Sequence, residues 1–173
     1  MKLKVMTVAI AISLFLAASA CSKQADRSYK DSVKTALEQA DLKDVTVNED
    51  VDKNTITLGG TLHSEDAKEK AADVAKANAG SRLVVNEVSV QPVGQESEAK
   101  TINSNLDDGI ENNYKAALVS KGLDKEHIRF DAKNGVLELK GTVKTPAQRK
   151  AAEQLAQAVP NVQQVLNDID VKR

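Results

Sequence analysis

The second half of this chain repeats the first half at a constant offset of 81 residues. Residues 83–90 (LVVNEVSV) correspond to residues 164–171 (QVLNDIDV), and residues 56–62 (ITLGGTL) correspond to residues 137–143 (LELKGTV). The two copies align without a gap over residues 29–92. Such a chain is expected to fold as two copies of one module of roughly 65 residues, and its function must be one that a duplicated module can perform.

The first 20 residues have the features of an export signal. Lys2 and Lys4 precede the apolar segment 5–16, and small residues follow it. This segment is shorter than the roughly 20 apolar residues that span a membrane. The predicted organisation is a signal peptide at 1–20, a tether at 21–26, a first domain at 27–92, a partly helical linker at 93–102 and a second domain at 103–173.

Cys21 is the only cysteine, and it directly follows the small residues of the signal. Residues 16–21 (LAASAC) resemble a bacterial lipobox, in which the cysteine is acylated and becomes the new N-terminus. Residues 18–20 also form an A-x-A site, so ordinary cleavage would release a soluble periplasmic protein. We favour lipidation, because a lone thiol is a liability in an oxidising compartment. Ser22 stands where, by the same resemblance, the absence of Asp implies the outer membrane.

The charge balance argues against a nucleic-acid partner. The formal net charge is −1, and removal of Lys2 and Lys4 takes it to −3. Residues 28–92 carry 8 basic and 12 acidic side chains, whereas residues 103–173 carry 11 and 10. Aromatic residues make up only 2% of the chain. A nucleic-acid binder would instead show a basic field and stacking aromatic side chains.

Each copy has the element order helix-strand-strand-helix-strand. Apolar residues at 29, 33, 37 and 40 indicate an amphipathic helix, and alternation over 55–62 indicates a strand with one packed and one wet face. Ser64 and Thr145 are predicted N-caps, and Asn134-Gly135 is a hairpin turn. The closing strand of the first copy is predicted over 84–90, and a further helix is predicted to begin near Ser97. The predicted fold class is α+β, with two tandem αββαβ modules, each a three-stranded mixed sheet with two helices on one face.

These patterns resemble the BON family of bacterial envelope proteins. The shared pattern includes a strand that reads apolar-x-apolar-x-Gly-x-apolar and a closing strand that reads apolar-Asn-x-apolar-x-Val. The resemblance implies attachment to phospholipid membranes and support of envelope integrity, with membrane phospholipid or envelope proteins as partners. It also implies that the long helix of the second domain contacts anionic lipid, and Arg149 and Lys150 are predicted to lie at the start of that helix.

The best candidates for contact with anionic lipid are five basic residues of the second copy: Lys140, Lys144, Arg149, Lys150 and Lys172. Several of them surround a predicted helix N-terminus, which itself favours anions. Each basic residue near an anionic membrane contributes about 1 kcal/mol. The alternative is an ordinary solvated face, because Glu138 and Glu153 are close in sequence.

Two further pairs of residues occupy equivalent positions in the repeat. Gly60 and Gly141 are explained either by a ligand that approaches the bare backbone or, as we favour, by a helix that crosses closely. Asn86 and Asn167 lie on an apolar strand face and need hydrogen-bond partners. We favour bonds to nearby backbone over a ligand contact.

The sequence shows no catalytic constellation. His63 and His127 are not equivalent in the repeat, and no phosphate loop or nucleophile elbow is present. We therefore expect no enzyme activity, no cofactor or metal and no small-molecule substrate. The predicted function is that of a lipid-anchored envelope protein that faces the periplasm and binds phospholipid or envelope proteins. The alternative is a soluble periplasmic stress or chaperone-like protein.

Overall fold

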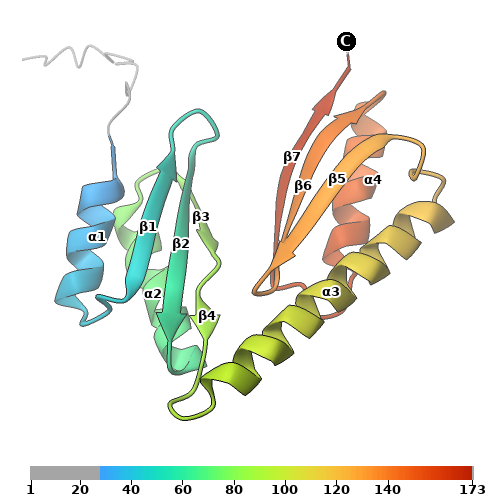
Figure 1. The fold of residues 1–173 in the computed structure, drawn as a ribbon. Helices are drawn as coiled ribbons and strands as arrows, with labels where there is room; N and C mark the ends of the chain where they lie inside the picture. The colour runs from blue at the N-terminus through green and yellow to red at the C-terminus, as the bar shows by residue number, and fades with distance from the viewer. Residues whose placement is uncertain (1–27, 173) are drawn as a thin grey trace, which may run out of the picture.

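The computed structural model describes residues 28–172, so the signal and Cys21 lie outside the described residues. The elements of the first module are α1 (Lys30–Gln39), β1 (Val45–Asp50), β2 (Thr55–Leu62), α2 (Glu65–Asn78), β3 (Leu83–Asn86) and β4 (Ser89–Val90). Those of the second module are α3 (Glu96–Ser120), β5 (His127–Lys133), β6 (Val136–Val143), α4 (Pro146–Gln157) and β7 (Gln164–Val171). Figure 1 shows the two modules as separate sheet-and-helix units.

Each module has its own mixed sheet. In the first, β2 pairs antiparallel with β1 and parallel with β3, and the short β4 extends the same edge. In the second, β6 pairs antiparallel with β5 and parallel with β7. The predicted α+β fold of two αββαβ modules is confirmed. The closing strand of the first copy differs from the prediction, because it is interrupted between Asn86 and Ser89 instead of running from Val84 to Val90.

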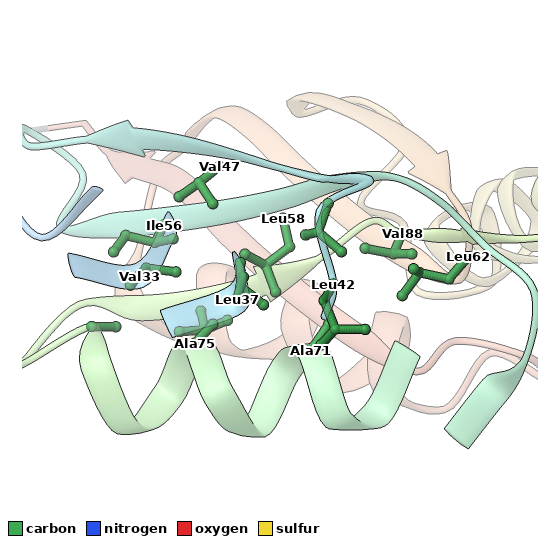
Figure 2. Packing of buried hydrophobic residues seen from close by; sticks show 13 residues of the cluster. Val33, Leu37, Leu42, Val47, Ile56, Leu58, Leu62, Ala71, Ala75 and Val88 are labelled. Carbon is green, nitrogen blue, oxygen red and sulfur yellow. The ribbon is translucent and has the colours of Figure 1, made fainter. Parts of the chain in front are cut away.

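Each sheet packs its helices on one face around its own apolar core. In the first module, Val33 and Leu37 of α1 meet Ile56 and Leu58 of β2, as Figure 2 shows. Alanines on α2 complete this core. The second core has the same plan, and its largest buried side chain, Tyr114, donates a hydrogen bond to the carbonyl oxygen of Ala152 at 3.2 Å. The small alanines let the helices lie close to the sheets, which compensates for the shortage of aromatic residues.

The predicted helix starts are confirmed by their capping bonds. The Ser64 hydroxyl accepts a hydrogen bond from the Ala67 N–H, and Thr145 forms a reciprocal capping box with Gln148. Asn134 and Gly135 both have positive φ in the β5–β6 turn, as a two-residue hairpin requires. The long helix begins at Glu96, one residue from its predicted start. These signals are local, so sequence alone specifies them.

The prediction that the sheet face opposite the helices is solvent-exposed is wrong at the junction between the modules. Thr55, Val85 and Val136 point away from the helices of their own modules, yet they are 4%, 0% and 3% exposed. Thr55 and Val136 are equivalent positions of the repeat. Parts of the two outer faces are therefore covered where the modules meet, which no periodicity within one copy reveals.

Candidate functional site

Four of the five predicted lipid-contact residues gather at one end of the second module. We define this basic end as residues 121–127, 143–150 and 171–172, where β5 begins and β6 and β7 finish. It carries six basic residues against two acidic ones. The equivalent end of the first module, residues 40–46, 62–69 and 90–91, carries two basic and five acidic residues. The repeat has thus diverged to place opposite charges at equivalent surfaces.

Lys144 and Lys172 of the basic end surround one carboxylate. The Lys144 ammonium lies 3.1 Å from Glu126 Oε1, and the Gln148 amide donates to the same oxygen at 3.1 Å. These hydrogen bonds, together with the charges of Lys144 and Lys172, lower the pKa of Glu126 although its partial burial raises it. Glu126 therefore stays ionised and neutralises part of the basic end.

Arg149 and Lys150 lie on the first turns of α4 and are exposed. The Arg149 guanidinium donates to the Asn167 carbonyl oxygen at 2.9 Å. The prediction that these two residues begin the long helix of the second module is wrong, because that helix is α3 and α4 has only 12 residues. The long helix α3 carries five acidic and two basic side chains, so its charge does not favour anionic lipid.

Lys140 lies apart from the other four residues. It is in the middle of β6, on the sheet face opposite the helices, and its ammonium lies 2.5 Å from Glu138 Oε2. The structure therefore divides the predicted set into four residues at the basic end and one on the outer face of the sheet.

The two repeat glycines are held by a neighbouring strand, and the predicted close approach of a helix is wrong. Both have positive φ, +100° for Gly60 and +116° for Gly141. A Cβ on Gly141 would overlap the carbonyl oxygen of His127, and one on Gly60 would overlap that of Asp44. The backbone at the start of β1 and β5 occupies the space, so these glycines have a structural role.

Asn86 and Asn167 find the protein partners that their burial requires. The Asn86 amide donates to the carbonyl oxygen of Lys68 at 3.0 Å, and its Oδ1 accepts from the Val88 N–H at 3.3 Å. In the second copy, Asn167 Nδ2 donates to Glu153 and Oδ1 accepts from the Ile169 N–H. Each Asn satisfies the backbone N–H two residues further along the chain and ties this segment to the preceding helix.

Sequence analysis missed the junction between the modules, where β3 and β7 are the facing strands in Figure 1. The Gln164 side-chain amide donates to the Val84 carbonyl oxygen at 2.9 Å and accepts from the Asn86 N–H at 3.4 Å. It therefore binds the free edge of β3 as a backbone amide would. The Asn134 amide donates to the Glu87 carbonyl oxygen at 2.8 Å.

Lys68 is the buried charge of the junction. It is 6% exposed, and its ammonium donates to Asn134 O at 3.3 Å and to Gln163 Oε1 at 3.2 Å, both in the other module. Burial lowers the pKa of Lys68, and the charges of Glu65 and Asp107 oppose this effect. A signal was present in the sequence, because Lys68 shares a helical stripe with the core residues Ala71 and Ala75.

A cavity of about 230 Å³ lies beside Lys68 at the junction. Its apolar wall comes from Val88, Leu106 and Ile110, and its polar wall includes Lys68 and Asp107. Both Asp107 carboxylate oxygens accept backbone N–H groups of the β5–β6 turn, at 2.8 and 3.1 Å. These bonds fix α3 to the β5–β6 turn of its own module, and the Asn103 amide links the same helix to the first module by donating to the Ser89 hydroxyl at 3.3 Å.

Among residues 28–172, no group of three or more His, Cys, Asp or Glu side chains is arranged to hold a metal ion. In the same part of the chain, no helix has both the length and the hydropathy that a membrane span requires.

Two αββαβ modules with separate cores define a tandem-repeat α+β protein. Residues 25–92 and 106–173 each match the family model described as the BON domain, so this chain belongs to the BON-domain family. It is 30% identical to osmotically-inducible protein Y of Escherichia coli K12 over 149 residues, which are 85% of this chain and 73% of that protein. The family resemblance inferred from sequence is confirmed.

Two solved structures of CdsD, a structural protein of the type III secretion system of Chlamydia trachomatis, were also matched. They are 16% and 15% identical to this chain, cover 83% of it and have TM-scores of 0.35. The match spans 67% and 61% of those chains.

Proposed function

We propose that this chain is a non-enzymatic envelope protein, anchored by an acylated Cys21, whose basic end contacts anionic phospholipid headgroups. The observation that carries the proposal is the opposite charge of equivalent surfaces, six basic against two acidic residues in the second module and two against five in the first. Divergence of this kind within one fold favours a surface specialised for an anionic partner. The family and the osmotically inducible relative support an envelope and stress setting.

The geometry of the basic end fits headgroup contact. Lys144, Lys150 and Lys172 are exposed, and the N-terminus of α4 adds a positive dipole end beside them. Each cation contributes about 1 kcal/mol near an anionic surface, and salt screens the attraction. An acyl anchor raises the effective concentration of such a weak site at the membrane, so modest intrinsic affinity suffices.

Vesicle flotation of the acyl-free chain tests this function. We expect binding to vesicles that contain phosphatidylglycerol, weak binding to phosphatidylcholine vesicles, and release at 0.5 M NaCl. The triple variant K144Q/K150Q/K172Q should lose most of the binding. The matched control K34Q/K43Q/K76Q removes the same charge from exposed lysines of the first module and should lose less. Equal flotation with both lipids, or equal loss in both variants, overturns the proposal.

A soluble chaperone-like role is the second candidate, and one observation favours it. Val93, Ile102 and Leu106 are 77%, 57% and 43% exposed, and they lie close together in sequence before and along the first half of α3. Exposed apolar side chains at neighbouring positions are typical of protein contact surfaces. Mass spectrometry of the mature N-terminus separates the two roles, because a diacylglyceryl adduct on Cys21 supports the anchored form and an unmodified Cys21 supports the soluble form.

A further inference from the structure

The junction between the modules is held mainly by charged and polar groups. Lys53, in the β1–β2 turn, lies 2.5 Å from Asp168 and 3.6 Å from Glu138 of the second module. Lys133 lies 2.7 Å from Glu87 of the first module. These three ion pairs all cross the junction. The three carboxylate side chains are 22% to 23% exposed, whereas Lys53 is 39% and Lys133 is 59% exposed, so salt screens these pairs in part.

The contacts of the junction join equivalent positions of the repeat. Lys53 is equivalent to Asn134, and Glu87 is equivalent to Asp168. Lys53 contacts Asp168 across the junction, and the counterpart of Lys53, Asn134, contacts the counterpart of Asp168, Glu87. The same pair of repeat positions is therefore in contact twice, with the two modules exchanged. This is the pattern of a local pseudo-two-fold axis, in which each surface patch meets its own counterpart. The junction is thus a defined docking geometry of the two modules.

The apolar contribution to the junction is small. The outward-pointing residues buried outside the two cores are Thr55, Val85 and Val136, and two of these three are valines. The covalent connection is also short, because α3 begins six residues after Val90, with Gly94 at φ +81° between them. Ion pairs and hydrogen bonds therefore carry much of the closed arrangement.

Lys68 works against closure. Its ammonium is buried only while the modules are together, and the partners that it gains there are two neutral oxygens. An ammonium has three donors, and burial of a charge without a directly bonded carboxylate is unfavourable. The junction therefore combines attractive pairs that salt weakens with a buried charge that favours release into water.

We infer that the two modules form a clamp that is closed at low ionic strength and opens as ionic strength rises. The range of electrostatic interactions falls from about 10 Å at 0.1 M salt to about 3 Å at 1 M salt. Salt thus weakens the Lys53 and Lys133 pairs, while the separate core of each module persists. Opening frees the β3 edge at Val84 and Asn86, which Gln164 covers in the closed form, and exposes Val85. The clamp couples the salt content around the protein to exposure of a strand edge.

The distance between the modules tests this inference in the acyl-free chain with Cys21 replaced by Ser. Spin labels or fluorophores are placed at Thr35 on α1 and Gln154 on α4, two exposed helix positions. We expect one narrow distance distribution at 0.05 M NaCl and a growing population of longer distances toward 1 M NaCl. The circular dichroism spectrum should stay constant, which shows that both modules remain folded. A distance distribution unchanged across this range overturns the inference.

Variants separate the clamp from a general effect of salt. The variant K53Q/K133Q should show the long distances already at 0.05 M NaCl, whereas K68M should stay closed to higher salt than the parent. The matched control K34Q/K76Q removes two lysines whose ion pairs lie within the first module and should behave like the parent. If K53Q/K133Q follows the parent curve, or if K68M opens at lower salt, the assigned roles of these lysines are wrong.

Discussion

At the scale of single residues, Glu49 links β1 to the start of α1. Burial raises the pKa of Glu49, but hydrogen bonds from Ser28, Tyr29, Arg82 and Lys30 outweigh this effect and hold it at about 2, against an ordinary value of 4.5. A carboxyl group whose pKa is lower in the folded than in the unfolded chain stabilises the fold at pH values above the unfolded pKa. For Glu49 this stabilisation is lost as the pH falls from 4.5 toward 2. E49Q should therefore lose about 2 kcal/mol at pH 7 and flatten the pH dependence of urea unfolding below pH 5. E38Q, which removes an exposed pair, is the control.

Replacement of glycine by alanine should lower the stability of the fold at Gly141 and raise it at Gly109. G141A places a Cβ against the carbonyl oxygen of His127 at a φ of +116°, so it should cost more than about 2 kcal/mol. G109A adds a methyl group in open space on helix α3 and should stabilise by about 0.5 to 1 kcal/mol. Urea unfolding of both variants measures the difference. Equal destabilisation would contradict the account of the glycine at the β5–β6 contact.

At the scale of elements, the capping box of α4 can be tested by T145A. The Thr145 hydroxyl accepts from the Gln148 N–H at 3.2 Å, and loss of an N-cap costs about 1 kcal/mol. T35A makes the same chemical change at an exposed position inside α1 and should stabilise slightly, because Ala has the higher helix propensity. The measurement is the urea midpoint of each variant. A T145A midpoint equal to that of the parent would show that the cap contributes nothing to stability.

Element boundaries were predictable from sequence because their causes are local. Ser64, Thr145 and Asn134-Gly135 act on backbone groups only a few residues away. In the structure, α2 and α4 begin and the β5–β6 turn lies where these signals predict. The break between β3 and β4 was not predictable, since β7 has a similar sequence and stays continuous. Burial of Val85 and Val136 depends on the other module, so the alternation within one copy indicates the wrong environment. Lys68 lies on the buried stripe of α2, which the sequence does show, but its partners Asn134 and Gln163 belong to the other module, so its place in the junction could not be predicted from one copy.

At the scale of the whole molecule, two separate cores joined by a polar junction make two folding units that are coupled through few contacts. Gln164 contributes to this coupling by pairing with Val84 and Asn86 of the other module. In Q164A these backbone groups lose their partner, which costs about 1 to 3 kcal/mol where water does not replace it. The cost falls on the junction and not on either core.

Calorimetry of the acyl-free chain should therefore show closely coupled unfolding of the parent at 0.05 M NaCl and two resolved transitions in Q164A. The first transition of Q164A belongs to the less stable module. The second transition should have the same midpoint as the more stable module shows in the parent chain at 1 M NaCl. Q157A, an exposed change at the end of α4, should keep the parent profile. If Q164A and Q157A give the same profile, the amide of Gln164 does not couple the modules, and the other contacts of the junction, which include the ion pairs of Lys53 and Lys133, hold the closed arrangement.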